Sequence, residues 1–172
     1  MEKISINLFD TGSIQEAIRE IKLLERKYAE RTEILKERVA ESVGKLAQNG
    51  FNGAIVSDFT DGTSIEADVN VFSEKRGDMY VVIADGEDAV FVEFGAGVYH
   101  NGSVGTSPHP NGNELGMTIG SYGKGKGKQK AWGYYEGGDL FITHGCPATM
   151  PMLNAAKAVC SEIDKIAKEV FK

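Results

Sequence analysis

An acid, a histidine and a cysteine in the second half of the chain are of types that could do chemistry. Glu93 is a lone acid in an apolar run, between Val92 and Phe94, and His144 and Cys146 come just before a predicted helix. A carboxylate can serve as a general base, and a cysteine beside a histidine can serve as a nucleophile. One hypothesis is therefore a small hydrolase or nuclease that uses Glu93, His144 and Cys146.

The pattern around these residues fits a structural role better. A carboxylate in an apolar run is usually paired or bonded to a buried donor. Neither cysteine, Cys146 or Cys160, has the spacing of metal ligands, and the histidines all lie in a glycine-rich region (His100, His109 and His144). We therefore predict no catalytic residue, no metal and no cofactor. We also expect Cys146, close to a helix start, to be the more reactive thiol, and Cys160 to lie buried on that helix's apolar face.

A basic stretch at residues 123–128 is the second candidate for chemistry. It alternates glycine with lysine, and the lysines of this tip are Lys124, Lys126, Lys128 and Lys130. A phosphate-binding P-loop would need Gly-Lys-Ser/Thr followed by a helix, whereas Gly125 follows Lys124 and no amphipathic helix comes next. Lysines on a glycine-rich chain can still contact phosphates as loose charges. The second hypothesis is therefore a nucleic-acid-binding accessory domain.

Composition limits the choice of class. The chain has 172 residues and a hydrophobic fraction of 41%, which predicts a single domain, 1–172, with its own core. The net charge of −6 disfavours a general nucleic-acid binder. No apolar run approaches the roughly 20 residues of a membrane span, and the start lacks the pattern of a signal peptide. We expect a soluble protein with no membrane partner and two free thiols.

The elements that would hold these residues begin with a strand at residues 4–8 and a long helix. Ser13 and Glu16 fit a capping box. An apolar stripe then runs from Ile14 to Leu46 in steps of three and four residues, with an optional break at residues 30–33. We expect this stripe to face a sheet.

Strands are predicted at residues 54–59, 64–72, 79–84 and 140–143, and a last helix at residues 150–171. The run 65–71 should pair antiparallel with 79–84, and a turn at Asp85 and Gly86 should open another hairpin. Residues 89–94 fit either a strand or a short helical turn. The fold class is α+β: an antiparallel sheet of three to five strands, packed by the N-terminal and C-terminal helices.

A glycine-rich loop or arm is predicted at residues 98–138, and a segment of this length is usually either functional or disordered. Its aromatic residues could anchor a subunit interface or form a small second core (Tyr99, Trp132, Tyr134 and Tyr135). Both interpretations stay open at this point.

Two segments resemble motifs of the minor neck and tail-completion family of tailed phages, typified by gene product ten of the Hong Kong 97 coliphage. The first, residues 91–97, is similar to V-E-F-G-T-G, and the second, residues 145–156, to G-x-P-A-x-P before a final helix. The matching positions are Val92, Glu93, Phe94, Gly95, Gly97, Gly145, Pro147, Ala148 and Pro151. The order of elements is also similar over most of the chain. This sequence differs from the family's motifs at Ala96, Met152 and Asn154. Residues 49–53 stand where the family has an A-P-V-D-T-G-like segment.

The resemblance implies a structural protein of the head–tail junction in a phage or prophage, with no catalysis. It implies a homo-oligomeric ring that binds other neck and tail proteins, in the host cytoplasm during assembly and then in the virion. DNA would pass close to such a ring, and acidic walls would not hold its phosphates. The arm could become ordered against neighbouring subunits on assembly.

Overall fold

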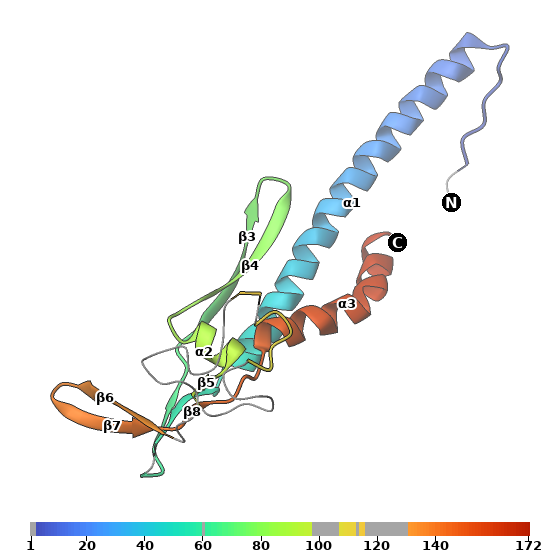
Figure 1. Cartoon of the computed structure of the whole chain (residues 1–172). Helices are drawn as coiled ribbons and strands as arrows, with labels where there is room; N and C mark the ends of the chain where they lie inside the picture. Colours follow the sequence, from blue (N-terminus) through green and yellow to red (C-terminus); the bar gives the residue numbers. More distant parts are fainter. Residues whose placement is uncertain (1–2, 60, 98–106, 113, 116–130) are drawn as a thin grey trace.

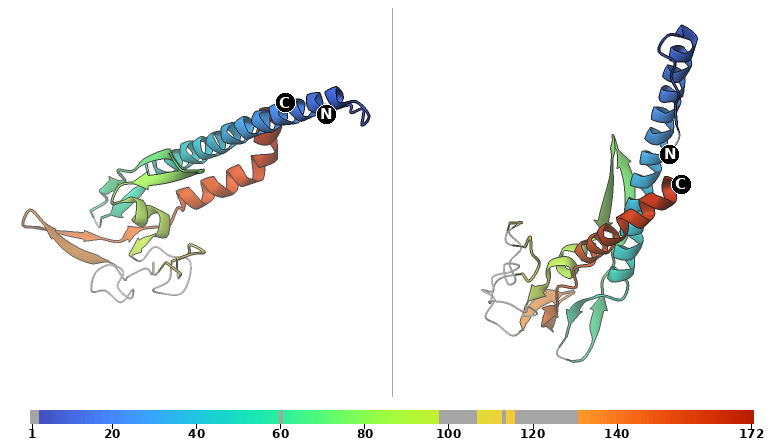
Figure 2. Two further views of the ribbon diagram at one scale, coloured as in Figure 1. Left: turned by 90° about the horizontal axis from the view of Figure 1, so that it is seen from above. Right: turned by 90° about the vertical axis from the view of Figure 1, so that its right-hand side faces the viewer.

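The computed structural model describes residues 3–59, 61–97, 107–112, 114–115 and 131–172. The molecule is elongated. Helix α1 (Thr11–Phe51) extends from one end of the body, and the hairpin of strands β6 (Trp132–Glu136) and β7 (Asp139–Thr143) projects at the other (Figure 1). Helix α3 (Pro151–Val170) and the hairpin of β3 (Asn70–Arg76) and β4 (Met79–Asp85) lie beside the C-terminal half of α1. Figure 2 shows the same arrangement from two further directions.

Helix α1 is one uninterrupted helix, Thr11–Phe51, so no break occurs at residues 30–33. The predicted capping box is wrong, because the side chain of Asp10 caps the helix by accepting the Gly12 N–H at 2.9 Å. Ser13 lies inside the first turn, where its Oγ accepts the Asn7 N–H. The predicted strand at residues 4–8 is also wrong, since this segment forms no strand and makes a turn at residues 8–9.

The middle of α1 is tied to a neighbouring strand by charge. Glu33 forms ion pairs with Lys36 and with Lys75 of β3, and these two ammonium groups lower the pKa of the Glu33 carboxyl to about 2. Lys36 also donates to the Asp78 carbonyl in the β3–β4 turn at 3.0 Å. Glu33, in the segment where the apolar stripe is thin, is therefore held by ion pairs.

Two faces of α1 are covered. Helix α3, Pro151–Val170, lies along the apolar stripe, and Tyr28 stacks on Phe171 with ring centroids 6.0 Å apart. A row of small residues, Ala40, Gly44 and Ala47, is buried on an adjacent face. A Cβ on Gly44 would lie 3.9 Å from a methyl of Val82, so this row faces the β3–β4 hairpin. The stripe therefore faces α3, and the expectation that it faces the sheet is wrong.

Strands pair only in twos among the described residues. The four antiparallel sheets join β1 (Ile55–Asp58) to β2 (Ser64–Glu66), β3 (Asn70–Arg76) to β4 (Met79–Asp85), β5 (Ala96–Gly97) to β8 (Gly145–Cys146), and β6 (Trp132–Glu136) to β7 (Asp139–Thr143). A single bridge between Phe59 and Thr143 links β1 to β7. The α+β class is confirmed, whereas one sheet of three to five strands is not what forms.

The predicted strand 64–72 is divided. Its first part pairs with β1, and its last part pairs with β4, where Val71 faces Ala84 and Phe72 faces Ile83. Gln48 of α1 fastens the start of β3. Its Nε2 donates to the Val69 carbonyl at 2.9 Å, and its Oε1 accepts the Val71 N–H at 2.7 Å. The Gln48 amide therefore makes backbone hydrogen bonds of the kind that a neighbouring strand would make.

Residues 89–94 form a helix, α2 (Ala89–Phe94), which settles the open choice against a strand. The preceding turn opens no hairpin, because Gly86 leads directly into this helix. Gly86 has φ 143°, and a Cβ there would lie 2.4 Å from the Asp68 carbonyl oxygen, so only glycine fits. Helix α2 completes a small core made of Phe51, Val69, Ala89 and Val92.

The predicted arm 98–138 ends in a strand, since β6 pairs with β7 across a turn at Gly137 and Gly138. Tyr135 is 75% exposed, so it does not belong to a second core. Tyr99 and the four lysines of the tip lie outside the described residues, as do the side chains of Trp132 and Tyr134. No helix among the described residues is long and apolar enough to cross a membrane.

Candidate functional site

Glu93 caps a helix that lies far away in the sequence. It sits near the end of α2 with 7% of its surface exposed. Its Oε2 accepts the Met152 N–H at 2.8 Å, and its Oε1 accepts the Leu153 N–H at 3.0 Å. The first N–H groups of a helix lack partners within the helix, and they favour a negative charge. The carboxylate therefore fixes the start of α3 to α2.

His109 is the third partner of Glu93. Its Nε2 lies 3.3 Å from Glu93 Oε1, and both side chains are buried. Its Nδ1 accepts the Asn111 N–H at 3.1 Å, so Nε2 is the ring nitrogen that faces the carboxylate. Its ring also packs on Phe94, with centroids 4.5 Å apart.

Ser107 holds the histidine segment against α2. Its hydroxyl donates to the Phe94 carbonyl at 2.6 Å and accepts the His109 N–H at 3.2 Å. Pro108 and Pro110 flank the histidine and restrict the backbone on either side of it. Residues 107–111 thus place the imidazole beside Glu93.

Backbone contacts complete the connection. Gly95 has φ 81°, and a Cβ there would lie 3.0 Å from the Ala148 nitrogen, so glycine lets the two segments approach. Ala96 pairs with Cys146, and the Thr149 N–H donates to the Val92 carbonyl at 3.0 Å. We call this unit the α2–α3 joint: residues 92–97, residues 107–111 and residues 145–153.

Cys146 is buried in the joint, and its thiol is bonded to a backbone carbonyl. It is fully buried, its thiol donates to the Phe91 carbonyl at 3.4 Å, and burial raises the pKa of the thiol to about 11. The thiol is therefore protonated at neutral pH. It lies in β8, before the helix begins, and the first free N–H groups of α3 bind Glu93 instead.

The expectation that Cys160 lies buried is wrong. Cys160 is exposed, because α3 turns Pro151, Ala155 and Val159 toward the body and leaves Cys160 on its outer side. Both cysteines are free. In the part of the chain that the structure describes, no group of three or more His, Cys, Asp or Glu side chains could hold a metal ion.

The motif positions mostly meet in this joint. Val92 is in the core, Phe94 contacts His109, and Pro151 is buried at the first turn of α3, where its missing N–H costs nothing. Gly97 and Gly145 pair between β5 and β8, and Ala148 lies against Gly95. Pro147 is exposed.

Two contributors were missed from the sequence. The contact of His109 with Glu93 is not predicted from the sequence, although the flanking prolines indicate a rigid turn. Gly50 is the second, and glycine near the end of a helical pattern usually indicates a helix stop. It lies within α1, where a Cβ would meet Pro151 at 2.9 Å, so it permits close packing of α1 on the start of α3.

In comparisons with known proteins, the chain matches no family model, no curated protein and no solved structure.

Proposed function

We propose that this chain is a structural component of the head–tail junction of a tailed phage or prophage. It acts by assembling with copies of itself and by binding neighbouring neck and tail proteins, without catalysis. The observation that carries the proposal is the α2–α3 joint, in which the two segments that resemble the neck-family motifs meet through Glu93.

The contacts in the α2–α3 joint explain why most motif positions need the residue type found there. Glu93 caps α3, Gly95 permits a close approach to Ala148, and Pro151 begins the helix. These roles need the residue types found there, and none of them involves a substrate. A motif made of such positions is expected in a framework that presents surfaces to other proteins.

The hydrolase or nuclease alternative is disfavoured by the same contacts. Both oxygens of Glu93 accept backbone N–H groups, and one of them also faces His109, so the carboxylate has no oxygen directed at a substrate. The Cys146 thiol stays protonated, since its pKa is about 11.

Surface area supports assembly. Helix α1 and the β6–β7 hairpin extend away from the body, so much of their surface is uncovered. Large apolar side chains are among the exposed ones, including Ile18, Ile21 and Leu140. A chain with so much uncovered surface is suited to burying it against partners.

The charge distribution fits a wall beside passing DNA. Residues 52–94 hold ten acidic and two basic side chains, so this region repels phosphates. The nucleic-acid-binding alternative depends on Lys124, Lys126, Lys128 and Lys130, which lie outside the described residues.

Deletion of the gene in its phage or induced prophage tests the proposal. We expect DNA-filled heads and complete tails to accumulate separately in electron micrographs, and purified protein added to that lysate to restore joined particles. Leu23→Gln protein, altered at an exposed side chain of α1, serves as a folded control and should restore joining equally. Normal joined particles formed without the chain would refute the proposal.

A further inference from the structure

One face of the β6–β7 hairpin is apolar and uncovered. Tyr135 pairs with Leu140, and Ile142 pairs with Gly133, so these side chains share a face. Tyr135, Leu140 and Ile142 are 75%, 53% and 42% exposed. We call them the hairpin face. Phe141, on the other side, contacts Phe59 of the body. A two-stranded hairpin is marginally stable by itself, so an uncovered face like this gains by acquiring a partner.

A second apolar surface lies on the N-terminal part of α1. The stripe that packs on α3 continues past the end of α3 to Ile21 and Ile18, which are 43% and 47% exposed. We call these two residues the α1 face. In Figures 1 and 2 this part of α1 runs on beyond both α3 and the β3–β4 hairpin.

The two surfaces differ in charge. Arg19, Lys22 and Arg26, at helical spacings of three and four, form an exposed basic row along one edge of the α1 face. The hairpin has an exposed acid, Asp139, at its turn, and residues 131–143 contain no Lys or Arg. One edge of the α1 face is therefore basic, with Glu25 as an acid on the face itself, and the hairpin turn is acidic.

We propose that the hairpin face of one copy packs on the α1 face of a second copy, with the acidic hairpin turn beside the basic row. This inference rests on the proposed function and names the surfaces through which its copies assemble. We take the partner to be a second copy of this chain, because the hairpin face and the α1 face are both apolar and their neighbouring charges are opposite.

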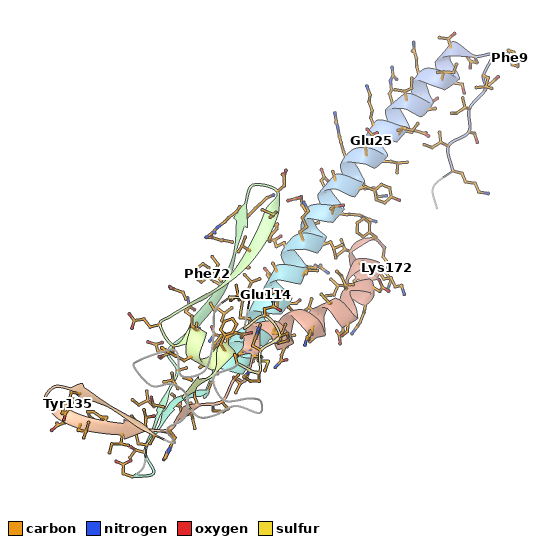
Figure 3. All side chains as sticks on the ribbon, viewed as in Figure 1. Phe9, Glu25, Phe72, Glu114, Tyr135 and Lys172 are labelled. Carbon is orange, nitrogen blue, oxygen red and sulfur yellow. The ribbon has the colours of Figure 1, made fainter. Side chains whose placement is uncertain are left out.

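The two faces cannot meet within one molecule. Figure 3 labels Tyr135 on the projecting hairpin and Phe9 at the tip of α1, and these mark opposite ends of the elongated chain. A contact between two different surfaces of identical copies is head-to-tail, and it closes into a ring when the rotation between neighbours permits. Pairing hairpin with hairpin would bring acidic turns together and leave the α1 face open.

Mixing two one-sided variants tests the contact. The hairpin variant carries Leu140→Thr and Ile142→Thr, which keep strand propensity, and the α1 variant carries Ile18→Gln and Ile21→Gln, which keep helix propensity. The matched controls are Leu23→Gln on the opposite side of α1, 63% exposed, and Met79→Thr on the other hairpin, 67% exposed. Analytical ultracentrifugation of the full chains gives their masses, and circular dichroism checks that each variant is folded.

We expect the wild type and both controls to form closed assemblies of more than two copies. Each one-sided variant alone should be monomeric, with a dissociation constant raised at least about tenfold. An equimolar mixture should give a dimer of one copy of each, because the α1 variant keeps its hairpin face and the hairpin variant keeps its α1 face.

Other outcomes overturn the contact. Self-association of the α1 variant would indicate hairpin-to-hairpin pairing, and self-association of the hairpin variant would indicate pairing between α1 helices. Absence of the mixed dimer, or loss of assembly in the controls, would also refute it. These results leave the proposed function standing if the protein still restores head–tail joining. Failure to join heads to tails by a protein that does form the mixed dimer would refute the proposed function alone.

Discussion

At the scale of single residues, one carboxylate organises the joint. Glu93 binds two backbone N–H groups of α3 and one imidazole, all within a buried environment. The sequence indicated that this acid would meet a donor, since it is the only charge in an apolar run. It did not indicate which donors, because they come from residues 59 and 60 positions later.

Replacing Glu93 should therefore weaken the fold. Glu93→Ala should lower the free energy of unfolding by about 1–3 kcal/mol, since it leaves two buried N–H groups without acceptors. Glu93→Gln should cost less, because the amide retains one acceptor oxygen. Urea denaturation measures both, with Glu162→Gln on the exposed side of α3 as the control. Unchanged stability of Glu93→Ala would contradict the capping role.

Because the Cys146 thiol is buried, we expect the protein to become less stable at alkaline pH. Burial raises the pKa of its thiol from 9.0 to about 11, so between these values the unfolded chain loses a proton that the folded chain keeps. The stabilisation is complete below pH 9 and is lost as the pH rises toward 11. Its size is up to about 3 kcal/mol, from the difference between the two pKa values.

Comparison of the wild type with Cys146→Ala isolates this effect from other groups that titrate in the same range. Unfolding free energies at pH 8 and pH 11 should fall further for the wild type than for the variant. Equal falls in the two proteins would show that the thiol does not resist ionisation. In native protein, thiol reagents should label Cys160 long before Cys146, because only Cys160 is exposed.

At the scale of elements, the sequence pattern predicted what depends on neighbours along the chain. Helical spacing gave α1 and α3, and the alternating runs gave the β3–β4 pairing. The sequence pattern did not predict contacts between residues that lie far apart along the chain. Gln48 bonds to the backbone at Val69 and Val71, where the predicted strand 64–72 divides, and the binding of Glu93 to α3 accompanies the helical form of residues 89–94.

The glycine at the end of α2 gives a test of the joint at this scale. Gly95 and Gly53 both have positive φ, 81° and 72°, so alanine is strained at either position. Only at Gly95 would the new Cβ meet another backbone, 3.0 Å from the Ala148 nitrogen, whereas nothing lies within 4 Å at Gly53.

Gly53→Ala should therefore cost about 1 kcal/mol from backbone strain alone, and Gly95→Ala should cost about 1–3 kcal/mol more by separating α2 from the start of α3. Thermal unfolding of the two variants side by side measures the difference. Equal destabilisation would mean that residues 95 and 148 are not in close contact.

At the scale of the whole molecule, the chain is long, sparsely buried and acidic in its middle third. Its core of fully buried large side chains is small, and apolar side chains remain exposed at both ends. The proposed ring gives these ends a function, since each copy would cover surfaces of its neighbours. The charges would serve two roles, with the acidic region facing DNA and the basic row of α1 contacting the next copy.

The most direct test of the structural role is the number of copies retained in purified particles. Quantitative mass spectrometry of particles banded by density should find this chain at a fixed number of several copies per particle, retained after washing in high salt. An enzyme or a DNA-binding accessory protein acts during assembly and need not stay in the particle. Absence of the chain from purified, infectious particles, or a trace amount that varies between preparations, would contradict the proposed function.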